Sequence, residues 1–470
     1  MDILRWSIVL LGGLLSAWGA GHALLNKRDP RSAVAWIAVC FVLPFLGALL
    51  YYVFGKNRIL TRARRLRLEK KSHAQEFLTE QDHPVSILDD YINLAELSWA
   101  ASRNNLLGGN SVAALHNGDN AYPAMLHAIE NAKAYIYLTT YIFDTREIGK
   151  QFMAALAAAL ARGVVVKVLI DGVGEKYGFP WASLVLRRLG VDTALYLPPT
   201  LLPPSLTINL RNHRKLLLID SELGFTGGMN IRNNHVLARS KNGVIDMHFL
   251  LRGPILRQME RTFINDWLFS TGEALECKPK ENYIAHSSNM ACRVLLEGPD
   301  EDNDKLTWVL VGAISVARKS IAIMTPYFLP SRELEVALLT AALRGVKVHI
   351  VLPGKNNMPF MTWAVKHMAP GLIDAGVKIC FSSGPFVHTK LFVVDDYYVQ
   401  VGSSNLDARS LRLNFELVVE VYDRQLGVEM GEHIRTIRRK ATPLSAAELR
   451  RRNVFVRVWN AFFWLFSPYL

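Results

Sequence analysis

Two stretches of the chain place a histidine, a lysine and an aspartate in the same order and at the same spacing. After six further residues, each continues with Gly-Gly or Gly-Ser and then, two positions later, an asparagine. The residues are His213, Lys215, Asp220 and Asn230 in the first stretch and His388, Lys390, Asp395 and Asn405 in the second. One such pattern arises easily by chance, but two with identical internal spacing indicate one site built from two half-sites.

Each histidine-lysine pair precedes a short apolar run, residues 216–219 and 391–394, that is typical of a β-strand. Side chains two residues apart on a strand point to the same face, roughly 6.5–7 Å from each other. An imidazole and an ammonium at that spacing suit a phosphate, because the imidazole can attack phosphorus while the ammonium neutralises a non-bridging oxygen. The two asparagines would add amide donors, and the adjacent glycines would let backbone N–H groups approach.

The motif aspartates, Asp220 and Asp395, stand at an odd offset from their lysines, so a regular strand turns them to the opposite face. We therefore interpret them mainly as structural acids at strand ends. Asp246 and Glu416 are better candidates for orienting the imidazoles, since a carboxylate on one ring nitrogen fixes the tautomer and supports protonation of the other. The remaining histidines in apolar surroundings are expected to be core residues: His235, His248, His349 and His433.

The paired motif resembles the signature of the phospholipase D superfamily, over about residues 110–425. The resemblance implies two similar α/β halves packed face to face around one site that needs neither metal nor cofactor. It also implies a two-step mechanism with a covalent phosphohistidine. By resemblance His213 is the nucleophile and His388 the general acid and base, while Lys215 and Lys390 hold the phosphate.

Longer phrases resemble the bacterial cardiolipin synthases of that superfamily, which join two phosphatidylglycerol molecules into cardiolipin and release glycerol. These phrases cover residues 35–58, 207–215, 224–230 and 325–330, and Ser331 departs from the pattern where an acid is expected. The implied partners are membrane phospholipids and anionic lipid headgroups, and not nucleic acid. Three alternatives stay open: a phospholipase D-type hydrolase or a transferase with another donor or acceptor, a nuclease, and a lipid-binding scaffold with a decayed site.

Two apolar segments at the start of the chain, residues 6–25 and 33–54, predict a transmembrane helical hairpin over 1–58. A cleaved signal peptide is the alternative for the first segment. Eight lysines and arginines follow within residues 56–71 against one acid, Glu69. By the positive-inside rule they predict a multi-pass protein of the bacterial inner membrane with its catalytic part on the cytoplasmic side. The net charge of +13 suits anionic partners.

The rest of the chain repeats a pattern of strand, Ala/Leu-rich helix, strand and motif strand, which predicts two α/β halves with mostly parallel central sheets. We expect a basic linker and helix over 59–105, the halves over 106–275 and 276–440, and an amphipathic tail over 441–470. Aromatic residues of the tail and of two loops, 177–206 and 356–368, suit either a membrane interface or the protein core. The four cysteines show no metal-binding spacing.

Overall fold

The structure, a computed structural model, describes residues 2–27, 30–55, 85–199, 210–240, 243–275, 288–298 and 304–467. The basic run 56–71, the rest of the expected linker to residue 84, loop residues 200–206, residues 207–209 and the expected boundary at 276 lie outside these ranges. The chain divides into two compact units, Met1–Lys71 and Ser72–Leu470.

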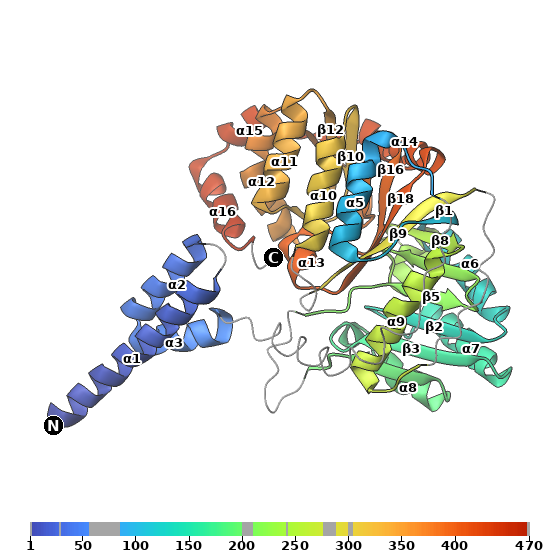
Figure 1. The fold of residues 1–470 in the computed structure, drawn as a ribbon, viewed down its shortest axis with the longest axis horizontal. Helices are drawn as coiled ribbons and strands as arrows, with labels where there is room; N and C mark the ends of the chain where they lie inside the picture. The colour runs from blue at the N-terminus through green and yellow to red at the C-terminus, as the bar shows by residue number, and fades with distance from the viewer. Residues whose placement is uncertain are drawn as a thin grey trace. The chain divides into compact units, whose positions relative to one another are not determined.

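The N-terminal unit consists of helices packed along one another (Figure 1). They are α1 (Asp2–Asn26), α2 (Pro30–Val42), α3 (Pro44–Leu50) and the π-helical turn η1 (Tyr51–Gly55). Within the described residues, one helix is long and apolar enough to cross a membrane, over Ile3–Asn26 with mean hydropathy 1.7. The second expected span is broken between α2 and α3, so the second crossing stays a prediction.

The break in the second span is caused by a proline. Pro44 has no N–H, so the carbonyl of Cys40 loses its helical donor. The hydroxyl of Ser16 on α1 donates to that carbonyl at 2.7 Å. This bond pairs a carbonyl that would otherwise lack a donor, as an apolar surrounding requires.

The second unit is built on a sheet of 15 strands in the order β19-β13-β12-β10-β15-β16-β18-β9-β1-β8-β6-β5-β2-β3-β4. The strands of the first half are β1 (Leu107–His116), β2 (Tyr135–Thr140), β3 (Val165–Asp171), β4 (Asp192–Tyr196), β5 (Leu216–Ile219), β6 (Leu223–Gly227) and β8 (Met247–Arg252). Those of the second half are β9 (Met290–Glu297), β10 (Ser320–Met324), β12 (Lys347–Pro353), β13 (Lys378–Ser382), β15 (Leu391–Val394), β16 (Tyr398–Gly402), β18 (Glu416–Tyr422) and β19 (Thr442–Pro443). Two short parallel pairs stand outside the sheet, β7 (Val244–Ile245) with β14 (Phe386–Val387) and β11 (Phe328–Leu329) with β17 (Leu406–Asp407).

The sheet is mixed, which corrects the expectation of mostly parallel sheets. Only β2-β3-β4 and β10-β12-β13 pair in parallel, and the other pairings within the sheet are antiparallel. The motif strands β5 and β15 each end in a tight turn with two central residues, Asp220-Ser221 and Asp395-Asp396, and all four of these residues have φ between 51° and 56°. Such turns close hairpins, and hairpin strands are necessarily antiparallel. The α/β class and the two similar halves are confirmed.

Strands β1 and β9 join the halves into one sheet. The sheet nevertheless folds back on itself, because β6 contacts β16 although β18, β9, β1 and β8 separate them in strand order. This curvature brings the ends of the two motif strands toward each other.

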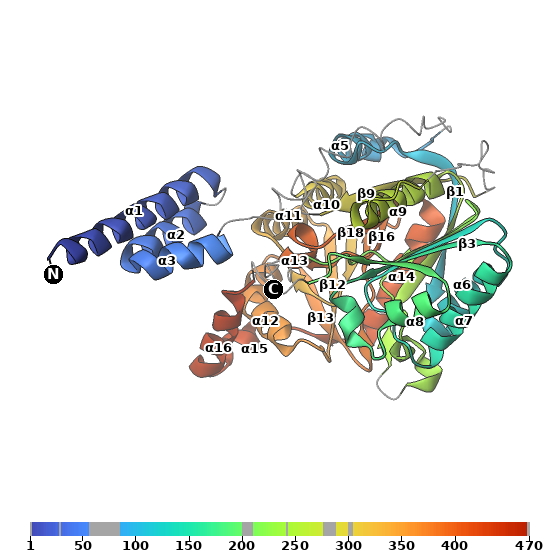
Figure 2. The ribbon, with the colours of Figure 1, turned by 90° about the horizontal axis from the view of Figure 1, so that it is seen from below.

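Helices cover both half-sheets (Figure 1). They are α5 (Ile92–Ser102), α6 (Asn117–Glu130), α7 (Glu147–Ala161), α8 (Ala182–Arg188), α9 (Ile255–Thr271), α10 (Lys305–Val316), α11 (Arg332–Leu343), α12 (Pro359–Asp374), α13 (Ala408–Arg412), α14 (Arg424–Arg439), α15 (Ala446–Arg451) and α16 (Val454–Trp464). Helix α5 lies outside α10 (Figure 2), and its Leu94 is buried in the core of the second half. The end of the expected linker is therefore part of the folded unit.

Candidate active site

Each motif histidine is held by backbone of the opposite half. The N–H of His213, just before β5, donates to the carbonyl of Phe415, just before β18, at 2.9 Å. The N–H of His388 donates to the carbonyl of Ile245 at 2.7 Å, next to the parallel pair of β14 and β7. Each half therefore holds the motif histidine of the other half through an equivalent backbone hydrogen bond.

The imidazoles repeat this exchange with their side chains. Nδ1 of His213 lies 3.1 Å from Oε1 of Glu416, and Nδ1 of His388 lies 2.7 Å from Oδ2 of Asp246. Both carboxylates are fully buried, while both imidazoles keep 13% of their surface exposed. Because Nδ1 of each ring lies against a carboxylate, Nε2 is the nitrogen that can face a substrate, and in His388 it also lies 3.2 Å from Nζ of Lys390. The structure thus brings Asp246 and Glu416 to the histidines, each to the histidine of the other half.

Burial dominates the electrostatics of the two imidazoles. It lowers the pKa of His213, an effect that Glu416 opposes. Burial, followed by the nearby Lys390, lowers the pKa of His388 to about 4. Burial by itself would raise the pKa of both carboxylates, but the nearby histidines and lysines together hold it below the ordinary value. At neutral pH each pair is therefore an ionised carboxylate beside a neutral imidazole.

The two lysines bend back over their own histidines. Nζ of Lys215 donates to the carbonyl of His213 at 2.6 Å, and Nζ of Lys390 donates to that of His388 at 2.7 Å. Burial lowers the pKa of Lys215 to about 7 and that of Lys390 to about 8. Repulsion from Lys390 is part of the shift at Lys215, so the two ammonium groups share one site. A phosphate anion placed there would favour their charged forms.

The motif aspartates turn away from the imidazoles. Asp220 accepts hydrogen bonds from the backbone N–H groups of Lys133, Ala134 and Tyr135, at 2.7–2.8 Å. Asp395 accepts the equivalent three, from Arg318, Lys319 and Ser320, at 2.7–2.8 Å. Each carboxylate therefore ties a hairpin turn to the chain that enters the neighbouring strand, β2 or β10.

The two asparagines differ in what they offer a phosphate. Oδ1 of Asn230 accepts from the N–H of Ile142 at 3.1 Å, which leaves the amide nitrogen to donate. In Asn405 the nitrogen donates to the hydroxyl of Ser410 at 3.0 Å. Its buried Oδ1 has no partner among the described residues. Only Asn230 is thus oriented as the expected donor.

The two orienting carboxylates, Glu416 and Asp246, also have different neighbours. The hydroxyl of Ser403 donates to Glu416, which accepts a further bond from the side-chain amide of Asn414 at 3.1 Å. Gly228 takes the place of Ser403 in the first half. A Cβ there would lie 2.3 Å from Oδ1 of Asp246, so only glycine leaves room for this carboxylate. Position 228 therefore has a steric reason for being smaller than position 403.

Two site residues were not anticipated. Nδ1 of His235 lies 3.9 Å from Asp246, and its ring centroid lies 6.2 Å from that of His388. His235 is buried, as expected of a core histidine, but it is beside the reacting group. The ring centroid of Tyr141 lies 5.2 Å from that of His213, in an edge-on arrangement. His235 follows Asn230 at the interval at which Ser410 follows Asn405, a spacing in the repeat that could have indicated it.

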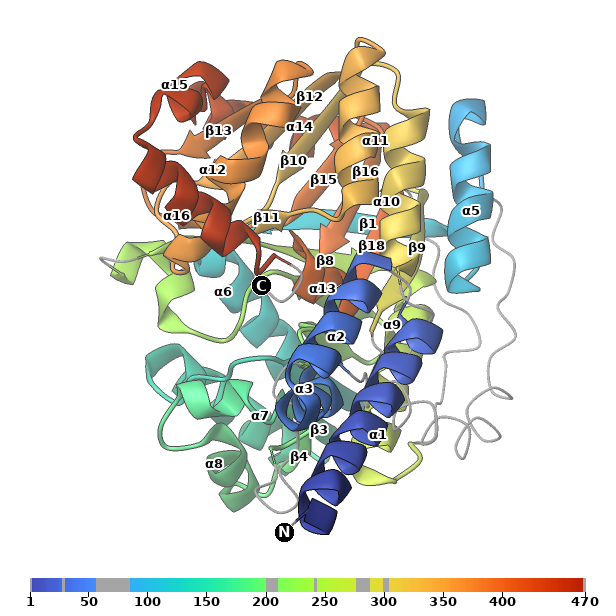
Figure 3. The same cartoon turned by 90° about the vertical axis from the view of Figure 1, so that its left-hand side faces the viewer.

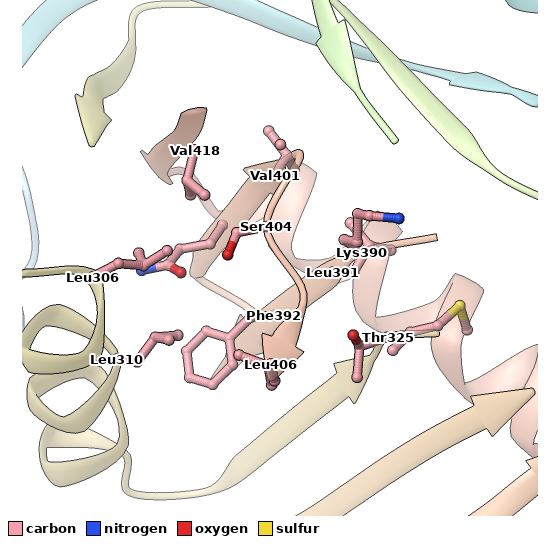
Figure 4. Close-up of a pocket in the computed structure, with 13 residues that line it drawn as sticks. Leu306, Leu310, Thr325, Lys390, Leu391, Phe392, Val401, Ser404, Leu406 and Val418 are labelled. Atoms are coloured by element: carbon pink, nitrogen blue, oxygen red, sulfur yellow. The ribbon is translucent and has the colours of Figure 1, made fainter. Parts of the chain in front are cut away.

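A small cavity adjoins the site in the second half (Figure 4). Its volume is about 30 Å³, and Lys390, Thr325 and Ser404 line it together with apolar side chains such as Leu310 and Phe392. That space suits ordered water and is too small for an acyl chain. In the described part of the chain, no cluster of three or more His, Cys, Asp or Glu is arranged to hold a metal ion. Independence from metals and cofactors stays a prediction.

Two similar α/β halves that exchange contacts at paired His-Lys motifs define a protein of the phospholipase D superfamily. The chain matches the family described as "Cardiolipin synthase, PLD-like domain" over residues 125–267 and 310–438, and it belongs to that family. Residues 14–56 match a second family, "Phospholipase_D-nuclease N-terminal". Together with the apolar helix α1, this match indicates a membrane-associated protein.

Similar proteins cover nearly the whole chain. A cardiolipin synthase of Clostridium perfringens (strain SM101 / Type A) is 30% identical over 94% of this chain and 95% of its own length. The major cardiolipin synthase ClsA of Bacillus subtilis (strain 168) is 31% identical over 95% of both. The crystal structure of phosphatidylserine synthase from Haemophilus influenzae Rd KW20 has a TM-score of 0.63, covers 80% of this chain and all of that one, and is 17% identical. That last similarity concerns the fold alone.

Proposed function

We propose that the paired site transfers the phosphatidyl group of one phosphatidylglycerol to the headgroup hydroxyl of a second, giving cardiolipin and glycerol. Family membership makes the chain a phosphatidyltransferase of the cardiolipin synthase type. The observation that carries the proposed chemistry is the pair of crossed His-carboxylate contacts, with both lysines in the same buried site.

In the first step, Nε2 of His213 attacks phosphorus, a P–N bond forms and the P–O bond to glycerol breaks. Glu416 on Nδ1 stabilises the positive charge that develops on the ring. The bound phosphodiester anion favours protonation of His388, and this imidazolium, stabilised by Asp246, gives its Nε2 proton to the departing glycerol oxygen. Lys215 and Lys390 neutralise the charge on the non-bridging oxygens, where it increases in the transition state.

In the second step, the headgroup hydroxyl of another phosphatidylglycerol replaces glycerol. His388 removes its proton, with Asp246 stabilising the resulting imidazolium. The hydroxyl oxygen attacks phosphorus, the P–N bond to His213 breaks and cardiolipin forms. After the two steps the site groups have regained their original charge and protonation, and the two phosphatidylglycerol molecules are the only reactants. The proposed scheme therefore needs no cofactor.

The protein is proposed to be multi-pass, with α1 and the paired α2-α3 crossing the inner membrane and the catalytic unit on the cytoplasmic side. Support comes from the packing of α1 along α2 and α3 and from the satisfied Cys40 carbonyl at the break. Helix α2 spans about 20 Å, less than a bilayer core of roughly 30 Å, so α3 must complete the crossing. Reporter fusions at both termini test this, since a periplasmic C-terminus would contradict it.

The deciding experiment supplies the purified full-length protein with phosphatidylglycerol in mixed micelles containing EDTA, followed by mass spectrometry of the lipids. We expect cardiolipin and glycerol in equal amounts, and neither from His213→Ala or His388→Ala. Phosphatidic acid as the main product would make the protein a hydrolase. Loss of product on adding EDTA would contradict a metal-independent site.

A further inference from the structure

The catalytic unit exposes two clusters of large apolar side chains, which come from distant parts of the sequence. The first, the aromatic loop, contains Tyr177, Phe179 and Trp181, with Phe179 85% exposed. The second is the outer face of α16, where Phe455 is 80% and Val458 62% exposed. Exposed aromatics gathered in this way mark an interaction surface rather than ordinary surface composition.

Ring contacts connect the aromatic loop to the active site. The ring of Tyr177 lies 6.2 Å from that of Tyr141, which in turn lies 5.2 Å from the ring of His213. Tyr177 is also close to Tyr327 of the second half, where it adds to the effect of burial in raising the pKa of that phenol. The loop therefore borders the site where the two halves meet.

Helix α16 is connected to the same region through α12. It runs beside α12 (Figure 3), with the ring of Phe463 4.9 Å from Trp363 and 6.4 Å from Phe360. Helix α12 contacts β11, which pairs with β17 directly after Asn405. The inner face of α16 thus packs on the enzyme, and its outer face is left to a partner.

The surroundings of α16 are positively charged. Arg451, Arg452 and Arg457 are exposed and have no carboxylate partner among the residues that the structure describes. Arg452 lies near Lys366 of α12, whose pKa is lowered first by burial and then by that arginine. A helix with apolar side chains on one side and unpaired arginines beside them suits the interface of an anionic bilayer.

We propose that the aromatic loop and the outer face of α16 form one membrane-docking surface, which seats the catalytic unit on an anionic phospholipid bilayer beside its active-site opening. The cavity at Lys390 is too small for an acyl chain. A lipid substrate whose chains stay in the bilayer needs an active site that opens toward the membrane. Docking would shorten the distance that a headgroup has to travel. The inference rests on the proposed function for the identity of the substrate and for the anchoring of the chain by its N-terminal hairpin.

The test measures depth in the membrane directly. The full-length protein, with Cys277→Ser to remove the thiol outside the described residues, carries one nitroxide-labelled cysteine at a time in proteoliposomes of phosphatidylglycerol and a zwitterionic lipid. The described cysteines, Cys40, Cys292 and Cys380, are buried. Labels go on Phe455→Cys, Phe179→Cys and, as a matched control on α11, Leu343→Cys, whose native side chain is 74% exposed.

We expect the labels at 455 and 179 to be accessible to oxygen and shielded from a water-soluble nickel chelate, and the label at 343 to show the reverse. Chelate accessibility at 455 and 179 equal to that at 343 would overturn the proposal. Shielding of only one of these two labels would overturn the proposal that the aromatic loop and α16 form a single surface. The hairpin keeps every variant on the vesicle, so the readout reports docking and not recruitment.

Turnover measured on vesicle and on monomeric substrate distinguishes a docking role from a catalytic one. Phe455→Ser combined with Val458→Ser should lower turnover on vesicle phosphatidylglycerol on the order of tenfold, with Leu343→Ser as control, and leave turnover on monomeric short-chain phosphatidylglycerol unchanged. Unchanged turnover on vesicles, or an equal loss on both substrates, would overturn a docking role. A wild-type protein that makes no cardiolipin from either substrate would refute the proposed function while the depth measurement still decides docking.

Discussion

Nδ1 of His213 lies 3.1 Å from the carboxylate of Glu416, a residue 203 positions further along the chain. His388 and Asp246 repeat the relationship in the opposite direction across 142 positions. Neither half therefore supplies both a motif histidine and the carboxylate that orients it. The site exists only when both halves are folded against each other.

Removing the charge of either orienting carboxylate should reduce turnover with little change in stability. Glu416→Gln and Asp246→Asn keep the side-chain volume but no longer stabilise an imidazolium. We expect turnover to fall on the order of 10²- to 10⁴-fold, the range for a carboxylate that orients a catalytic histidine. Initial rates of cardiolipin formation measure this, with the surface variant Asp374→Asn as control. Near wild-type rates would contradict the assignment.

Asp220→Asn and Asp395→Asn should have the opposite profile. Each substitution replaces a carboxylate oxygen that accepts backbone N–H groups with an NH₂ that opposes them. We expect a loss of about 1–3 kcal/mol in the free energy of unfolding. Denaturant titration measures it, and turnover per folded molecule should change only a few-fold. A large turnover loss at unchanged stability would show that these acids act on the chemistry.

The different support of the two carboxylates predicts unequal effects at positions 228 and 403. Gly228→Ala places a Cβ 2.3 Å from Oδ1 of Asp246 and must displace that carboxylate from His388. Ser403→Ala removes only one of the donors to Glu416. We expect a turnover loss on the order of 10²-fold or more for the first and about tenfold for the second. Equal losses would contradict the steric explanation.

Anion binding should be coupled to proton uptake. Burial holds the pKa of Lys215 at about 7 and that of Lys390 at about 8, so both are partly neutral at pH 8. A bound phosphodiester favours their charged forms, which raises both pKa values and draws protons from solution. Deacylated phosphatidylglycerol keeps its charge across this range and is a suitable probe.

Calorimetry in two buffers of different ionisation enthalpy measures the uptake. We expect proton uptake at pH 8, little at pH 6 where both lysines are already charged, and affinity that decreases as the pH rises above about 7. Lys390→Met should reduce the uptake at pH 8. Proton release on binding would contradict the lowered pKa values of the lysines.

Much of the site could be predicted from local sequence. The apolar runs 216–219 and 391–394 are strands, and their histidines and lysines converge because the repeat predicts two halves of the same design. The odd offset of Asp220 and Asp395 placed them away from the imidazoles. His235 is expected from sequence to be an ordinary buried histidine, because only the tertiary structure brings it beside Asp246 and His388.

The sequence by itself determined the motif residues, the α/β class, the two similar halves and the apolar start of the chain, because spacing and periodicity are local properties. Only the tertiary structure decided which carboxylate serves which histidine, since those contacts join residues 142 and 203 positions apart. It also decided that the sheet is mixed and continuous through β1 and β9, and that α5 packs on the second half. These features depend on which surfaces are buried together, and no local pattern encodes that choice.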